Sequence, residues 1–309
     1  MSIFRKTVTY LAALLAAVAI IPSCEKEEDH DYREAVVRRG IPFSLQIDDL
    51  KPVDTKSVIN DPYIETKITC VTLASYSASS GQLISTEYFV AGEDIVLDTG
   101  SDSEVTVYAF VNMGDLTAAI PANRSGISAV TYDIPAYTGS DDSIEERGIP
   151  MAGTLDFDEA HPEAATISVR RLLAKLAVDL SLDWDATITS VQIKGMNKHL
   201  TPFGESRARS ASDTFSEEIE SGNGLSSGTF VFYIPENEQG TVPSIVSSVE
   251  KSGDNSVLSA VKDRLTYMEV TTEGTGLHSG TMVYRSYLGK NATSDFAITR
   301  NCRYTRTVT

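Results

Sequence analysis

The sequence predicts an all-β protein built from two β-sandwich domains in tandem. Three observations support this fold class: short segments with period-two alternation of apolar and polar residues, turn-rich pieces between them, and few helical patterns. The chain has 309 residues, of which 41% are hydrophobic, enough to bury two ordinary domains.

The N-terminus has the pattern of a secretory signal peptide over residues 1–23. Arg5 and Lys6 precede an apolar run too short to span a membrane, and the run ends at Ser23-Cys24. A cysteine directly after a small residue resembles a bacterial lipobox, so we expect cleavage between Ser23 and Cys24 and acylation of Cys24. The alternative is an ordinary signal peptide with an incidental cysteine.

Residues 24–39 are polar and acidic, and we expect a flexible tether there. The run also resembles the acidic export tag of Bacteroidales surface lipoproteins, and a simple solvated spacer is the alternative. We expect the lipid to hold the protein at the outer membrane, on the cell surface.

The first expected strand covers residues 40–49. Ile41, Phe43, Leu45 and Ile47 alternate with polar or small residues, so one face of this strand should be buried and the other wet.

The same reasoning predicts strands at 67–75, 83–90, 105–111, 166–171, 172–182, 188–193, 229–234, 281–288 and 302–308. Only 115–120 and 256–267 are fair helix candidates. The polar stretch 156–165 is a plausible junction, which divides the chain into domains at 40–165 and 166–309.

Composition and motifs favour a non-enzymatic protein. The formal net charge of −17 gives no electrostatic footprint for nucleic acid. The four histidines are scattered, no nucleophile elbow or phosphate loop occurs, and Cys70 and Cys302 are expected to be buried thiols. Carboxylate groups at 156–159 and 183–185 could bind calcium or pair for glycoside hydrolysis, but solvated charges at strand ends are more common. We therefore predict no catalytic residue, no metal and no cofactor.

Five segments in order resemble the fimbrillins of Bacteroidales pili, the donor-strand subunits of the FimA type, also called type V pili. They are Val105-Thr-Val-Tyr-Ala-Phe-Val-Asn-Met-Gly114, Arg147-Gly-Ile-Pro-Met-Ala-Gly153, Arg170-Arg-Leu-Leu-Ala-Lys-Leu-Ala-Val178, Phe232-Tyr-Ile-Pro-Glu-Asn237 and Arg300-Asn-Cys-Arg-Tyr304. The resemblance spans about residues 40–309 and implies two transthyretin-like β-sandwiches, lipoprotein export and assembly into a fimbria with a role in adhesion.

The resemblance also implies a mechanism of assembly. In the family a protease cuts after the first strand, which leaves, and a strand of the next subunit fills the open groove by β-strand addition. Here the departing strand would be 40–49, with Ile41, Phe43, Leu45 and Ile47 as the plugs. The alternative is an ordinary first strand that stays in place.

Two departures from the family pattern keep other roles open. The loop at 50–62 contains Lys51 and Lys56 but no arginine, and the nearest arginine pair, Arg38-Arg39, precedes the strand. Processing is thus expected at Lys56 or Arg39, although a cut at Arg39 would leave the strand in place. The chain also stops at Thr309, where family members usually continue with donor strands.

The expected partners are other fimbrial subunits and a ligand on a host or bacterial surface. An uncut, lipidated chain would instead be a pilus anchor or accessory subunit. A surface glycan-binding lipoprotein is the rival from another class, and it would need exposed aromatic residues such as Trp184.

Overall fold

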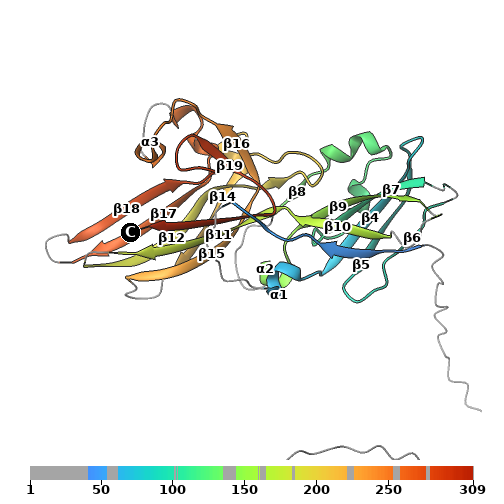
Figure 1. Cartoon of the computed structure of the whole chain (residues 1–309), viewed down its shortest axis with the longest axis horizontal. Helices are drawn as coiled ribbons and strands as arrows, with labels where there is room; N and C mark the ends of the chain where they lie inside the picture. The colour runs from blue at the N-terminus through green and yellow to red at the C-terminus, as the bar shows by residue number, and fades with distance from the viewer. Residues whose placement is uncertain are drawn as a thin grey trace, which may run out of the picture. The chain divides into compact units, whose positions relative to one another are not determined.

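β-strands make up most of the described chain. The computed structural model describes residues 41–53, 62–100, 102, 104–134, 144–158, 160, 165–182, 185–220, 226–252, 258–275 and 279–308. Strands dominate these ranges and pair into several sheets, while the helices are single short turns (Figure 1). The predicted all-β sandwich fold is confirmed. Within these ranges, none of the helices has the length and apolar character required to span a membrane.

The first sandwich contains a six-stranded sheet. Its order is β2 (Ser44–Ile47), β10 (Thr166–Arg171), β9 (Met151–Asp158), β7 (Glu104–Val111), β4 (Cys70–Ser77) and β5 (Leu83–Val90). β1 (Ile41–Pro42) pairs separately with β6 (Val96–Leu97). All neighbouring pairs are antiparallel except β2 and β10, which run parallel.

The six-stranded sheet separates into two layers between β9 and β10. These strands share only the pairs Val169↔Gly153, Arg170↔Ala152 and Arg171↔Met151, and the rest of β10 pairs with β2. At Gly153 an added Cβ would lie 2.1 Å from the carbonyl oxygen of Ser168, so only glycine allows this approach. The apolar core between the layers contains Phe43 and Ile167 from one side and Leu73, Val107 and Phe157 from the other.

The second sandwich packs two four-stranded sheets against each other. One has the order β15 (Ser227–Pro235), β11 (Leu173–Ser181), β20 (Cys302–Val308) and β3 (Lys51–Pro52). The other has the order β14 (Thr214–Glu220), β12 (Ala186–Asn197), β17 (Tyr267–Gly274) and β18 (Gly280–Tyr287). Buried side chains from both sheets, among them Leu176, Val178, Val191, Phe232 and Tyr304, form one core.

Short elements complete the fold. Two small sheets pair β13 (His199–Leu200) with β8 (Tyr132–Asp133) and β16 (Asn237–Thr241) with β19 (Asp295–Ile298). The helices are α1 (Pro62–Thr66), α2 (Ile144–Arg147), α3 (Ser248–Ser252) and the 3₁₀ turns η1 (Thr117–Ala119), η2 (Arg124–Ala129), η4 (Ala211–Asp213), η5 (Leu258–Ala260) and η6 (Lys262–Arg264).

Most of the strongly alternating segments form the predicted strands. Those predicted at 83–90, 166–171 and 302–308 match β5, β10 and β20 to the residue. The two helix predictions are wrong: 115–120 holds only the turn η1, and 256–267 holds η5, η6 and the start of β17.

The polar stretch expected to be a domain junction begins inside a strand. Asp156 and Asp158 belong to β9, and the hydroxyl of Thr106 donates to the Asp156 carboxylate at 2.8 Å. The strand that follows the stretch, β10, pairs with strands of the first sandwich. The division of the chain into domains at 165 and 166 stays a prediction.

Candidate functional site

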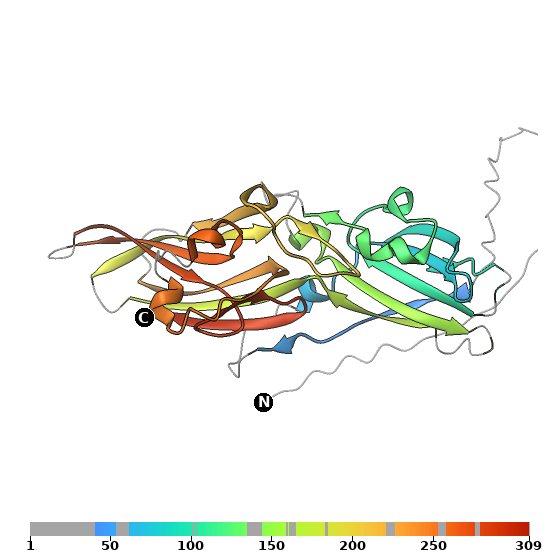
Figure 2. The same ribbon diagram turned by 90° about the horizontal axis from the view of Figure 1, so that it is seen from above.

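The first described segment lies at the edge of two sheets. Ile41–Pro42 pairs with β6, Ser44–Ile47 pairs in parallel with β10, and Lys51–Pro52 pairs in parallel with β20. β2 is the last strand of the six-stranded sheet and β3 is the last strand of a four-stranded sheet. One short piece of chain therefore completes an edge of each sandwich. Figure 2 shows it in blue beside the yellow-green β10.

Alternate side chains of this segment face the core of the first sandwich, as their spacing predicts. Phe43 is 6% exposed and packs edge-to-face on Phe157, with ring centroids 5.3 Å apart. Ile41, Leu45 and Ile47 are partly buried against the same core, whereas Ser44 and Gln46 are exposed. We call Ile41, Phe43, Leu45 and Ile47 the plug residues, and the surface they cover the first-strand seat.

Two buried side chains hold the backbone of the segment where it leaves β2. Arg171, at the end of β10, donates from Nη1 to the carbonyl of Asp48 at 2.7 Å and to Oδ1 of Asn301 at 3.3 Å. Asn301 donates from Nδ2 to the carbonyl of Asp49 at 2.9 Å, and its own carbonyl accepts the amide of Lys51. These contacts go to backbone groups, so they do not depend on which side chains the strand carries.

A buried ion pair holds the chain where the described residues resume, at α1. Glu65 in α1 accepts from Lys175 Nζ and, at 3.2 Å, from the hydroxyl of Tyr233. The Glu65 carbonyl also accepts two hydrogen bonds from Arg171, at 3.0 and 2.7 Å. Burial lowers the pKa of Arg171, and the nearby Glu65 partly offsets this effect. α1 is thus anchored to β10, β11 and β15, and Arg171 contacts both α1 and the segment 41–53.

The segments that resemble fimbrillin motifs supply most of these polar side chains, and sequence reasoning did not identify the role of these side chains. Arg171 comes from one segment, and Asn301 and Arg300 come from another. Glu236, from a third, pairs with the partly buried Arg300, whose Nε donates to Glu236 Oε1 at 2.8 Å. Asn112, from a fourth, donates to the carbonyl of Lys67 at 2.8 Å and of Ile149 at 2.9 Å. Their only signal in the sequence was the presence of charged and amide residues inside apolar strand patterns.

Several predicted positions lie outside the described residues. These are Ser23, Cys24, Arg39 and Lys56, together with Trp184 and three of the four histidines. Within the described ranges, no three His, Cys, Asp or Glu side chains are grouped so that they could hold a metal ion. Cys70 and Cys302 are both buried free thiols, as expected, and burial raises the pKa of Cys302.

Comparison with solved structures identifies the fold. A candidate cell adhesion protein of Parabacteroides distasonis matches with a TM-score of 0.58 and 12% identity, over 86% of this chain and 87% of that one. The tip fimbrial protein Mfa3 of Porphyromonas gingivalis matches with a TM-score of 0.54 and 15% identity, over 79% of this chain and 90% of that one. A candidate cell adhesion protein of Bacteroides eggerthii also has a TM-score of 0.54, with 14% identity, over 87% of each chain. The chain has the fold of fimbrillin-like proteins.

Sequence comparison adds a family without an assigned role. Residues 232–308 match the model of a domain of unknown function, DUF4906. This range begins at Phe232-Tyr-Ile-Pro-Glu-Asn237 and includes Arg300-Asn-Cys-Arg-Tyr304. No curated protein matches the sequence. The resemblance to fimbrillins predicted from five short segments is confirmed at the level of the fold.

Proposed function

We propose that this protein is a structural, non-enzymatic subunit of a cell-surface fimbria and joins its neighbours by β-strand complementation. We further propose that it is exported as a lipoprotein through Cys24, reaches the outer membrane, and contributes to adhesion. The first-strand seat carries this proposal, because one edge segment plugs a core through alternate apolar side chains. Its other contacts are mainly backbone hydrogen bonds, together with the side-chain contacts of Ser44 and Asp48 with β10.

The chemistry of the seat supports replacement of one strand by another. Backbone ladders with β6, β10 and β20, and the hydrogen bonds from Arg171 and Asn301, would accept any extended chain. Specificity would come from the plug positions, where a second strand needs apolar side chains at every other residue. An unfilled seat would expose apolar surface and an unpaired sheet edge, which is unstable in water.

The anchoring of α1 fits a cut between Val53 and Pro62. After such a cut the Glu65–Lys175 pair would keep the remaining chain in place, while the segment 41–53 would be held by non-covalent contacts alone. Full burial of an apolar side chain contributes about 1.5–3 kcal/mol. Phe43 is buried and the other three plug residues are partly buried, so together they retain the strand and its removal also needs a competing strand. Lys56 lies in this interval and is the proposed processing position.

The test is strand exchange on purified protein. A specific protease site is placed between Val53 and Pro62, the chain is cut, and a labelled peptide of residues 40–53 is added in excess. We expect the labelled peptide to replace the cut segment. We also expect the bound peptide to protect the cut protein against thermal unfolding. A peptide with Phe43→Asp and Leu45→Asp is the matched control and should not bind.

Two outcomes would contradict the proposal. If the cut protein neither releases its segment nor takes up the peptide, the first strand is an ordinary one, and an anchor subunit becomes the better account. If the control peptide binds equally well, the plug residues do not determine occupancy of the seat.

A further inference from the structure

A second site lies on the loop between β13 and η4, away from the first-strand seat. This loop, residues 201–210, carries Arg207 and Arg209, and Arg264 of η6 lies next to it, with its Nη1 3.5 Å from the carbonyl of Arg209. Two hollows open on either side of these arginines, of about 440 and 390 Å³. Both volumes are in the range of pockets that bind small molecules. Arg207 and Arg209 line both hollows and Arg264 lines the smaller one, on a protein whose net charge is −17.

The loop is held rigidly from beneath. The buried Arg300–Glu236 pair reaches it directly, with Arg300 donating to the carbonyls of Pro202 and Gly204, both at 2.7 Å. Glu236 accepts the amide of Ser206 at 3.0 Å. Asn237 accepts the amide of Ala208 at the same distance. These hydrogen bonds hold the backbone of every second residue of the loop, from Pro202 to Ala208, against the protein.

The alternate residues of the loop face outward. Ser206 and Ala208 are each 1% exposed, whereas Glu205, Arg207 and Arg209 are exposed. A side chain displayed on a backbone that is already ordered loses less entropy on binding a ligand. The ordered loop backbone therefore presents two arginine side chains and one carboxylate to the solvent.

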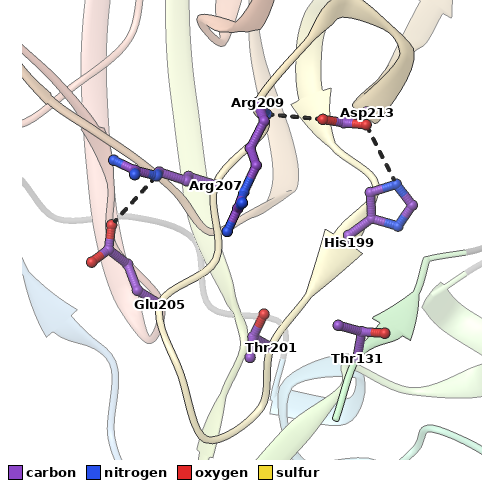
Figure 3. Close-up of a pocket in the computed structure, with 7 residues that line it drawn as sticks. All are labelled: Thr131, His199, Thr201, Glu205, Arg207, Arg209 and Asp213. Atoms are coloured by element: carbon purple, nitrogen blue, oxygen red, sulfur yellow. Dashed lines mark hydrogen bonds and ion pairs between the residues drawn. The ribbon is translucent and has the colours of Figure 1, made fainter. Parts of the chain in front are cut away.

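Positive charge remains available in the larger hollow. Within the described ranges no side chain forms an ion pair or hydrogen bond with the Arg209 guanidinium, and Arg207 is 4.0 Å from Glu205, at the limit of an ion pair. Asp213 accepts the backbone amides of Arg209 and Ser210, at 2.9 and 3.0 Å, which lower its pKa. Figure 3 shows the Arg209 side chain extending from the loop toward Arg207 and Thr201, while the Arg207 guanidinium turns toward Glu205.

The other lining groups suit hydroxyl groups. The hydroxyls of Thr131 and Thr201 can donate to or accept from sugar hydroxyls, and the Glu205 carboxylate can accept from them. His199, whose Nδ1 is 2.6 Å from Asp133, presents its other ring nitrogen near Asp213. Guanidinium groups bind carboxylates in a planar, two-bonded geometry. The carboxylates in the wall disfavour ligands with dense negative charge, such as phosphate diesters in nucleic acids.

We propose that the pocket around Arg207 and Arg209 binds a carboxylate-bearing sugar, with the sugar carboxylate on the two arginines and its hydroxyls on Glu205, Thr201 and Thr131. The proposal deepens the adhesive part of the proposed function by giving it a ligand class. It does not depend on strand exchange, so the two can fail separately.

The test is a titration of the full-length protein, followed by NMR, with two matched ligand pairs. Methyl glucuronide is compared with methyl glucoside, and a methyl sialoside with its carboxyl-reduced form. We expect at least one acidic sugar to bind about tenfold more tightly than its neutral partner, and acetate to bind more weakly than that sugar.

Variants assign the binding to this pocket. Arg209→Gln should raise the Kd about tenfold, whereas Lys290→Gln, which removes one exposed charge elsewhere, should leave it within about twofold. Arg209 is exposed, so its replacement should not change thermal unfolding. Equal binding of acidic and neutral sugars, equal binding of acetate, absence of binding, or equal effects of the two variants would each overturn the proposal.

Discussion

Buried arginines and amides determine where the strands of this protein change direction. Arg171 and Asn301 donate hydrogen bonds to the backbone carbonyls of the chain just after β2. Arg300, paired with Glu236, donates to the backbone of the loop that follows β13. A buried charge is costly unless it is paired or hydrogen-bonded. Arg300 is paired with Glu236, and Arg171 donates to the carbonyls of Asp48 and Glu65 and to the Asn301 amide oxygen. They therefore contribute more to specifying the fold than to its net stability.

Removal of Arg300 should be severely destabilising. In Arg300→Met the Glu236 carboxylate, whose residue is 5% exposed, stays buried without its partner. We expect a loss of about 3–5 kcal/mol in the free energy of unfolding, measured in urea. Lys290→Met is the control, because Lys290 is exposed and 3.5 Å from Glu238, and it should cost about 1 kcal/mol or less. Similar losses for both would refute the role assigned to Arg300.

The plug residues can be tested against a neighbour on the opposite face. Phe43→Asp and Leu45→Asp each place a charge against the apolar core, and Phe43→Asp should cost about 3 kcal/mol or more. Gln46→Asp introduces the same side chain on the exposed face and should change unfolding by less than about 0.5 kcal/mol. Unchanged thermal unfolding for Phe43→Asp and Leu45→Asp would exclude the strand as a plug.

Residue patterns predicted part of the site and not the rest. The four plug residues follow from period-two alternation, which is local in sequence. The rest of the site joins residues that are far apart in the sequence. Arg171 contacts Glu65 and Asn301, and Lys175 contacts Glu65, each across more than 100 residues, so no local pattern could place these side chains. The conformation of the loop with Arg207 and Arg209 likewise depends on hydrogen bonds with Arg300, Glu236 and Asn237, which lie on other elements.

At the scale of elements, the bend between β9 and β10 depends on one glycine. Gly153→Ala would place a methyl group 2.1 Å from the Ser168 carbonyl, so a strand must shift. We expect a loss of about 1–3 kcal/mol in unfolding free energy. Gly228→Ala is the comparison, because its added carbon meets only the edge of the Phe230 ring at 3.3 Å. A Gly153→Ala protein as stable as the Gly228→Ala protein would contradict this account of the bend.

Lys251 in α3 should make the free energy of unfolding depend on pH in the alkaline range. Burial lowers the pKa of Lys251 to about 8 from 10.5, Arg306 adds to this effect and Asp295 opposes it. Between these values the unfolded chain keeps a proton that the folded chain has lost, so Lys251 penalises folding less as pH rises. The unfolding free energy of the wild type should gain on the order of 2 kcal/mol relative to Lys251→Met between pH 7 and 10. A constant difference across that range would contradict the assigned environment.

Strict alternation explains the correct prediction of β10, where buried and exposed residues alternate along the whole strand. β17 instead places Thr272 and Gly274 at buried positions, so its sequence does not stand out as a strand. Of the helix expected over 256–267, the described residues form only the short turns η5 and η6, and Tyr267 already pairs as the first residue of β17.

At the scale of the whole molecule, one segment takes part in both sandwiches. β2 completes the sheet of the first sandwich and β3, a few residues later, pairs with the last strand of the second. Departure of this segment would therefore open an edge in each sandwich at once. The fold class and the resemblance could be predicted from sequence, but this shared edge depends on sheet topology, which short motifs do not encode.

The state of the N-terminus on the native cell surface tests the central claim most directly. Intact mass and N-terminal sequence would be measured for protein recovered from the outer surface. We predict a chain that begins between Asp54 and Asp61, near Ser57, with no lipid and no first strand. An uncut chain with an acylated Cys24 would contradict a polymerising subunit and would favour an anchor.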